Sequence, residues 1–297
     1  MTTSSEFHAG YLAIVGCPNV GKSTLMNRLI GAKLSITSSK AQTTRHRIHG
    51  ILTTDDSQYV FVDTPGLQMQ HRTALNRAMN RTVNSALADV DVILFVIDAK
   101  RWRNEDREVL ARLPSDRPIV LVINKVDRLT DKNALLPLMA AIANEHAFAD
   151  IVPVSAEKGE NLDTLLKVAG KHLPVAPPIF EPDELTDRSE RFLAAELLRE
   201  KLFRNLGEEL PYGIAVEIEK YEEVDGVRRI HAAVIVDRDA HKAIVIGRGG
   251  ERLKRVASDA RKDMEKLFGG KVWLETWVKV KSGWADDERA LKSLGYE

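Results

Sequence analysis

Short apolar runs alternate with longer amphipathic stretches over residues 1–174. Stretches with helical spacing, such as 22–31 and 133–147, separate the runs. This alternation predicts βαβ units, and therefore an α/β domain with a mostly parallel sheet and helices on both faces. The runs are short and β-branched, as buried parallel strands are. They are YLAIVG (11–16), YVFVDT (59–64), VILFVID (92–98), IVLVIN (119–124) and IVPVSA (151–156).

The pattern changes after residue 174. Four prolines in 173–187 predict an extended connector. Beyond it, the periodicity predicts a smaller α+β domain with helices on one antiparallel or mixed sheet. Its expected elements are a helix at 188–207, strands at 212–221 and 229–238 joined by a turn at Asp225-Gly226, a basic helix at 251–268, a strand at 271–280 and a short helix at 286–294. The expected domains are 1–174 and 188–297, with a linker at 175–187.

Composition narrows the class of protein. The chain has 297 residues and a formal net charge of zero, which names no partner. Its single cysteine, Cys17, excludes an intramolecular disulfide. The start of the chain lacks the pattern of a signal peptide, and no apolar run is long enough to cross a membrane, so a cytoplasmic protein is predicted. Residues 241–281 hold 11 basic and 5 acidic residues, a local charge that suits a polyanion.

A glycine-rich loop, GCPNVGKST (16–24), lies between the first predicted strand and a predicted helix. It matches the P-loop pattern G-x-x-x-x-G-K-S/T in the context that this motif requires. The glycines let backbone N–H groups point at phosphate oxygens, and the helix N-terminus adds a favourable dipole. Lys22 is expected to reach the β- and γ-phosphates, and the Ser23 hydroxyl is expected to bind Mg²⁺.

Three further motifs follow predicted strands. DTPG (63–66) places Asp63 to hold Mg²⁺ through water and the Gly66 N–H to sense a γ-phosphate. NKVD (124–127) supplies the Asp127 carboxylate for two guanine donors that adenine lacks. SAEKG (155–159) brings the Ala156 N–H to guanine O6. With the P-loop, these motifs predict GTP binding by Gly16, Cys17, Pro18, Asn19, Val20, Gly21, Lys22, Ser23, Thr24, Asp63, Thr64, Pro65, Gly66, Leu67, Asn124, Lys125, Val126, Asp127, Ser155, Ala156 and Glu157.

The threonine that senses Mg²⁺ must lie between the P-loop and Asp63. The segment SITSSKAQTTRHRI (35–48) is suitable, with Thr44 the first candidate and Thr43 the second, whereas Thr37 is expected to be a loop hydroxyl. Such a segment orders around Mg²⁺ and the γ-phosphate and relaxes after hydrolysis. The predicted switch residues are Gln42, Thr43, Thr44 and Arg45, and the predicted metal ligands are Ser23, Thr44 and Asp63.

One position departs from Ras-type enzymes, which carry a glutamine directly after D-x-x-G to orient the attacking water. Here that position is Leu67, and neither Gln68 nor Gln70 occupies it, so slow intrinsic hydrolysis is predicted. Asn19 belongs to a G-x-P-N-x-G-K-S pattern similar to that of GTPases with a K⁺ ligand at this place; the alternative is that Asn19 only shapes the loop. The predicted catalytic residues are Lys22, Thr44, Gly66 and Asn19.

A second glycine turn lies in KAIVIGRGGERLKRV (242–256). No lysine–serine pair follows Gly250, which excludes a P-loop. The G-x-x-G turn follows an apolar run and precedes a basic helix, and it resembles the KH module, in which such a turn clamps single-stranded RNA beside an apolar groove for bases. The order of the elements fits the bacterial, type II arrangement. The residues expected to bind RNA are Ile246, Gly247, Arg248, Gly249, Gly250, Lys254 and Arg255.

The tryptophans of this second domain are expected to be structural. Trp273 and Trp277 are four residues apart in one predicted strand, so they share a face. We expect both in the core, not as stacking platforms for bases. Trp284 precedes ADDERALKSL, whose first-turn acids predict a capped helix.

The GTPase motifs, followed by a KH module ending in WVKVKSGWADDERALKSLGY, resemble the Era family of bacterial Ras-like GTPases over essentially the whole chain. The resemblance implies hydrolysis of GTP to GDP and phosphate with Mg²⁺. It also implies binding to the 3′ end of 16S rRNA in the small (30S) ribosomal subunit during maturation, and loose, peripheral association with the inner membrane. Nothing in the sequence calls for more than a monomer.

Three functional hypotheses are compatible with two ligand sites in one chain. In the first, GTP gates RNA binding. In the second, RNA binding is constitutive, and the nucleotide controls docking to a protein or membrane. The third is an RNA-modifying enzyme, which no acid–base pair or metal cluster outside the GTP motifs supports.

Overall fold

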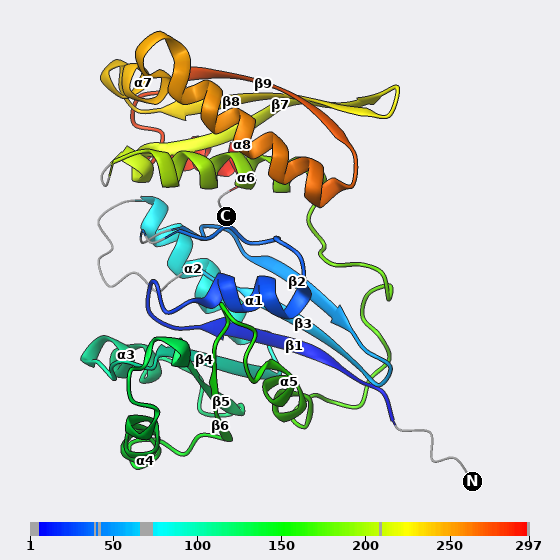
Figure 1. Ribbon diagram of the computed structural model, residues 1–297, viewed down its shortest axis with the longest axis vertical. Coiled ribbons are helices and arrows are strands. Elements are labelled where there is room, and N and C mark those ends of the chain that lie inside the picture. Colours follow the sequence, from blue (N-terminus) through cyan, green and yellow to red (C-terminus); the bar gives the residue numbers. More distant parts are fainter. Residues whose placement is uncertain (1–5, 39, 41–42, 66–73, 208–209, 296–297) are drawn as a thin grey trace. The chain divides into compact units, whose positions relative to one another are not determined.

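The computed structural model describes residues 6–38, 40, 43–65, 74–207 and 210–295 (Figure 1). Their contacts group them into two compact units. The N-terminal unit contains the described residues up to 35, together with 46–65 and 80–187. The C-terminal unit contains 188–295, and also the described residues of 36–45 and 74–79. Each unit has its own sheet.

The N-terminal unit has a six-stranded sheet in the order β2-β3-β1-β4-β5-β6, with helices on both faces (Figure 1). All neighbouring strands are parallel except β2 and β3. The strands are β1 (His8–Val15), β2 (Ile48–Thr53), β3 (Ser57–Asp63), β4 (Val92–Asp98), β5 (Ile119–Asn124) and β6 (Asp150–Val154). The helices are α1 (Lys22–Ile30), α2 (Ala74–Ala88), α3 (Asn104–Leu110), α4 (Leu135–Ala143) and α5 (Leu162–Gly170), with 3₁₀ turns at Val126–Arg128 and Lys132–Ala134; residues 74–79 of α2 group with the C-terminal unit. The predicted fold class of this unit is confirmed.

The strand β2 was not among the five expected strands. It lies at the edge of the sheet, antiparallel to β3. Gly50 interrupts its apolar pattern, and this glycine lies against α1: an added Cβ would meet the Ile30 side chain at 3.0 Å and Met26 at 3.2 Å. The close packing of α1 against β2 therefore explains why glycine stands at position 50, where it weakens the sequence pattern of a strand.

The expected linker runs along the N-terminal unit without helix or strand among residues 177–187. The Gln58 side chain accepts the backbone N–H groups of Ile179 and Phe180 at 2.7 and 2.9 Å, and the Ile51 N–H donates to the Leu185 carbonyl at 2.9 Å. These hydrogen bonds satisfy backbone groups that have no partner within the linker itself, because a proline-rich segment forms no helix or strand.

The C-terminal unit is built on a three-stranded mixed sheet in the order β7-β8-β9. The strands β7 and β8 are antiparallel, and β8 and β9 are parallel. The elements are α6 (Glu190–Asn205), β7 (Ile214–Val224), β8 (Val227–Val236), α7 (Asp239–Ile246), α8 (Glu251–Phe268), β9 (Lys271–Val280) and α9 (Glu288–Ser293), with 3₁₀ turns at Leu210–Gly213 and Arg248–Gly250. Its core joins α6, α8 and one face of the sheet through Leu197, Leu198, Leu202, Ile230, Ala232, Val234, Val256, Ala260 and Met264.

Local signals define most boundaries of this unit. The turn between β7 and β8 has positive φ at both Asp225 and Gly226, as the sequence predicts. The Asp287 side chain caps α9 by accepting the N–H groups of Arg289 and Ala290. The buried Trp284 donates its indole N–H to the Gly213 carbonyl at 3.1 Å.

Two features of this unit differ from the expectation. The apolar run before the G-x-x-G turn is a helix, α7, because Asp239 lies in its first turn and Gly247, with φ of +73°, ends it. The expectation that Trp273 lies in the core is wrong: it is 46% exposed, on the sheet face opposite α6 and α8, part of which Trp284 and α9 cover around Ile235. Trp277 is on the same face and is half-buried.

Candidate functional site

The P-loop follows β1 and leads into α1. Gly16 has φ of +156°, and a Cβ there would come within 2.2 Å of the Val96 carbonyl oxygen. Gly21 has φ of +103°, and its Cβ would meet the Asn124 amide nitrogen at 2.4 Å. Backbone conformation and lack of space therefore both require glycine at these two positions.

Two P-loop side chains are buried. Lys22 donates its ammonium to the carbonyl oxygens of Gly16 and Cys17 at 2.9 and 3.0 Å. Burial lowers the pKa of Lys22, and the nearby Asp63 carboxylate opposes this shift. Burial, and then the Asp106 carboxylate, raise the pKa of Cys17 to about 12, so its thiol is protonated at neutral pH and is a poor nucleophile.

Three side chains meet where β3 ends. The Ser23 and Ser35 hydroxyls donate to the same Asp63 carboxylate oxygen, Oδ2, at 2.8 and 2.5 Å. Asp63 and Ser35 are fully buried. Hydroxyl and carboxylate oxygens are the hard ligands that Mg²⁺ takes beside substrate phosphates, so the pair of Ser23 and Asp63 fits this ion.

Asn124 connects three of the predicted nucleotide-binding loops. Its amide nitrogen donates to the Val20 carbonyl of the P-loop at 2.9 Å. Its amide oxygen accepts the backbone N–H of Ala156 at 3.0 Å and that of Lys125 at 2.7 Å. A single buried side chain thus fixes the spacing of loops that follow β1, β5 and β6.

The rest of the NKVD motif is held by charge. The Lys125 ammonium contacts the Asn19 carbonyl at 2.5 Å and the Asp98 carboxylate at 2.9 Å. Burial alone would raise the pKa of Asp98, but the Lys100 N–H and Lys125 outweigh it and lower the pKa. The Ser155 hydroxyl donates to the Asp127 carboxylate at 2.6 Å, which orients this group.

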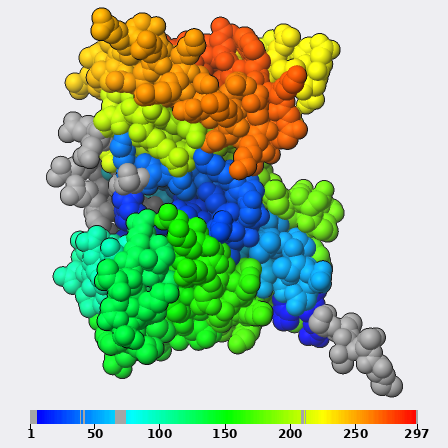
Figure 2. Space-filling model, in the orientation of Figure 1, coloured from blue at the N-terminus to red at the C-terminus, as the bar shows by residue number. Residues whose placement is uncertain are grey.

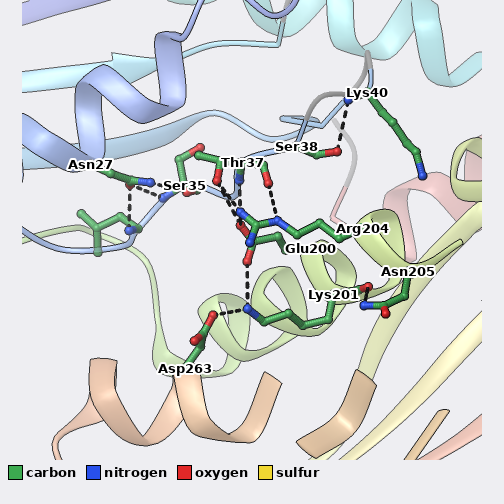
Figure 3. Close-up of polar contacts among 11 residues, drawn as sticks. Asn27, Ser35, Thr37, Ser38, Lys40, Glu200, Lys201, Arg204, Asn205 and Asp263 are labelled. Carbon is green, nitrogen blue, oxygen red and sulfur yellow. Dashed lines mark hydrogen bonds and ion pairs between the residues drawn. The ribbon is translucent and has the colours of Figure 1, made fainter. Parts of the chain in front are cut away.

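The described residues of the predicted switch segment between 36 and 45 belong to the C-terminal unit, where they pack against α6 (Figure 3). The buried Glu200 carboxylate accepts the N–H and hydroxyl of Thr37 at 3.0 and 3.2 Å. Arg204 contacts the same carboxylate at 2.9 Å and donates to the Thr37 carbonyl at 3.0 Å. Lys201 lies 3.5 Å from Glu200 and 2.5 Å from Asp263 of α8 (Figure 3). Thr37 is therefore more than a loop hydroxyl.

Three cationic side chains make further hydrogen bonds between this segment and the rest of the C-terminal unit. The Lys40 ammonium donates to the carbonyl oxygens of Phe203 and Leu206 at the end of α6, each at 2.5 Å. Arg199, paired with Glu196, donates to the Thr43 carbonyl at 2.6 Å. In the opposite direction, the buried Arg45 donates to the carbonyl oxygens of Ile214 and Tyr212 at 2.8 and 3.0 Å. Thr44 is buried in the same segment, and its role as a metal ligand stays a prediction.

The G-x-x-G turn joins α7 to α8. Gly247, Gly249 and Gly250 all have positive φ, and a Cβ on Gly247 would meet the Arg252 Cβ at 2.7 Å. Arg248 projects from the turn and is exposed. The turn therefore presents backbone and one cation to solvent, as contact with a phosphate backbone requires.

A groove of about 450 Å³ extends from this turn between α8 and β9. Leu253, Ala257 and Leu274 give it an apolar part, and Lys254 and Arg261 give it positive charge. The orange α8 lies on the visible face of the molecule in Figure 2. Arg255 is exposed but does not line the groove. Apolar surface beside a glycine turn with an exposed cation is an arrangement that can take single-stranded bases.

Several predicted site residues lie outside the described residues: Gln42, Gly66 and Leu67, with the neighbouring Gln68 and Gln70. Conversely, Ser35, Asp98 and Glu200 belong to these sites but were not predicted from the sequence. Asp98 ends a predicted strand beside other motif-bearing strands, which was a usable signal. Ser35 begins the predicted switch segment, but only the fold brings it to Asp63.

Two family models match the chain. The model for "50S ribosome-binding GTPase" matches residues 11–125, and the model for "KH domain" matches residues 209–285. The first match includes the P-loop and extends to the end of β5, before β6, and the second includes the G-x-x-G turn.

Relatives match over nearly the full length. GTPase Era of Nitrosomonas eutropha is 60% identical over 99% of this chain and 100% of its own, and GTPase Era of Chromobacterium violaceum is 55% identical over the same shares. A crystal structure of an Aquifex aeolicus Era variant bound to GDP·AlF₄⁻ has a TM-score of 0.94 at 41% identity, covering 98% of this chain and 99% of that one. A structure of Era with MgGDPNP and nucleotides 1506–1542 of 16S ribosomal RNA matches equally well.

Proposed function

This chain belongs to the Era family of GTPases, which hydrolyse GTP, and from that premise we propose that its GTP cycle gates binding of single-stranded 16S rRNA. The proposed RNA site is the G-x-x-G turn with the groove beside it, and the proposed target is the rRNA 3′ end in the maturing 30S subunit. Support comes from the exposed Arg248, the groove residues and the 16S rRNA fragment bound by a similar protein.

In the proposed nucleotide site, the P-loop N–H groups and Lys22 bind the phosphates, and Asp127 selects guanine. The Ala156 N–H, the proposed donor to guanine O6, donates to Asn124 in this structure and would have to be shared with the base. Ser23 and Asp63 would hold Mg²⁺, with Thr44 as the switch ligand. When bound, this ion neutralises phosphate charge. Ser155 orients the Asp127 carboxylate, and Asn124 keeps the base-binding loops next to the P-loop.

Asn19 is the proposed ligand of a K⁺ ion that supplies positive charge near the phosphates. It is exposed, and its positive φ of 65° directs the loop at this point. We expect GTP hydrolysis in KCl to be about tenfold faster than in NaCl, and Asn19→Ala to remove that difference. Equal rates in both salts would mean that Asn19 only shapes the loop.

The observation that carries the gating proposal is the short link between two sites. Ser35 donates to Asp63 in the N-terminal unit, and Thr37, two residues later, is bound by Glu200 in the C-terminal unit. Two residues span at most about 7 Å, so a movement of Ser35 caused by a ligand at Asp63 would also move Thr37. Glu200 neighbours Lys201, which pairs with α8, the helix that lines the RNA groove.

The test measures affinity for a short single-stranded RNA that ends in a 16S 3′ tail, with a GTP analogue, with GDP and without nucleotide. We expect tighter binding with the analogue, because the switch segment then orders differently on α6. Gly247→Asp with Arg248→Asp is the control and is expected to abolish binding in every state.

Equal affinity in all three states would refute gating on naked RNA and would favour the second hypothesis, in which the nucleotide controls docking elsewhere. Peripheral membrane association and a monomeric state stay predictions from the resemblance and the sequence. Among the residues that the structure describes, no helix is both long and apolar enough to cross a bilayer.

A further inference from the structure

The two faces of the C-terminal sheet differ in their cover. Along β9, Val272 and Val278 point into the core beneath α6 and α8. Trp273 and Trp277 point to the opposite face, where Trp273 is 46% exposed. An exposed apolar patch that polar residues surround marks an interaction site, and two neighbouring tryptophans can form one.

Neighbouring side chains hold these rings in place. The His231 ring lies edge-on to both, with centroid distances of 5.1 Å to Trp273 and 6.2 Å to Trp277. The Glu275 carboxylate, between them in sequence, pairs with His231 at 3.2 Å. Lys279 lies 6.0 Å from the Trp277 centroid. Such preorganised rings lose little conformational freedom on binding.

The two tryptophans alternate along β9 with residues that line the groove. The strand β9 is the edge of the sheet, and its residues Leu274 and Thr276, which alternate with the tryptophans, line the groove. Glu275 belongs to both surfaces, because it lines the groove and binds His231. A strand of RNA that leaves the groove across this edge would meet the tryptophans next.

We propose that Trp273 and Trp277 form a second base-binding site, on which nucleotides flanking those in the groove stack. The inference rests on the proposed RNA function of the groove. Aromatic stacking accepts any base, so the site would add affinity without strong sequence preference.

Charge on this face is compatible with RNA. Three carboxylates of this face, Glu275, Glu222 and Glu219, are paired with His231, Lys220 and Lys279 respectively. A fourth, Glu217, is exposed on the same face, in register with Ala233. Exposed Lys271 and Lys281 flank the tryptophans along the chain, and exposed Arg229 lies opposite Trp273 in the register. These cations can follow the phosphates while the bases stack.

The test compares unstructured RNA oligomers: a pentamer that fills the groove, and decamers extended on the 5′ or the 3′ side. In the unaltered protein, we expect one extension to raise affinity about tenfold or more, with quenching of tryptophan fluorescence. Trp273→Ala with Trp277→Ala should lose that gain yet bind the pentamer as before. Val280→Ala, a change at an exposed apolar residue of the same strand, is the matched control.

A gain that persists in the double variant, or no gain from either extension, would overturn the inference. If neither length binds, the groove proposal fails, and this one with it. An arginine-rich peptide that binds the unaltered protein but not the double variant would assign the face to a cationic protein segment instead. Unchanged GTP hydrolysis and an unchanged melting temperature would show that the variants fold. If the double variant does not fold, the same comparison is made with Trp273→Ala alone.

Discussion

Replacing Gly16 with alanine is expected to lower GTP affinity at least about a hundred-fold, because the new Cβ would lie 2.2 Å from the Val96 carbonyl oxygen. Both atoms are fixed by the central strands β1 and β4, so the P-loop itself must shift. Its N–H groups and Lys22 would then no longer converge on the phosphates. Titration with a fluorescent GTP analogue measures the loss.

The matched control is Gly31→Ala. Gly31 also has positive φ, +76°, but nothing lies within 4 Å of its added Cβ. This change should cost about 1 kcal/mol of unfolding free energy and leave GTP affinity unaltered. Equal loss of affinity in both variants would show that backbone strain, not the clash with Val96, sets the effect.

Glu200→Gln is expected to uncouple the two ligand sites. The amide would keep the size of the side chain but remove the charge that binds Thr37, Arg204 and Lys201. We expect RNA affinities with GTP analogue and GDP to become equal, at a cost of about 1–3 kcal/mol in unfolding free energy. GTP affinity should not change, since Glu200 is absent from the predicted nucleotide motifs.

The control for this variant is Glu222→Gln, the same chemical change in an exposed pair with Lys220 of the same unit. It should leave both stability and the nucleotide dependence of RNA binding as they are. A Glu200→Gln protein that keeps its full difference between nucleotide states would place the coupling outside the contacts with Thr37.

Features whose signal lies within a few neighbouring residues were predicted correctly from the sequence. The P-loop, the strand that ends at Asp63 and the turn at Gly247 each carry their signal within a few residues, because backbone conformation and strand ends determine them. The basic helix and the strand after it were predicted with the boundaries that α8 and β9 have.

Contacts between residues far apart in the sequence could not be predicted from local pattern. Glu200 looked like one acid among many on a helix, and only the fold brings it to Thr37, 163 residues away. Ser35 meets Asp63 for the same reason. Trp273 was expected in the core but is exposed. The spacing of Trp273 and Trp277 shows that they share a face of the sheet, but not which face α6 and α8 cover.

The contacts of Thr37, Lys40 and Thr43 with α6 also affect where the chain can be divided into fragments. A fragment that begins at Arg188 would lack the carbonyl groups and hydroxyl that Arg199, Arg204 and Glu200 now bind. In such a fragment these charged side chains would face water, although Arg199 and Glu200 are buried beneath residues of the predicted switch segment in the intact chain. The folding domain and the continuous stretch of sequence therefore do not coincide, and separate halves would each start from an incomplete surface.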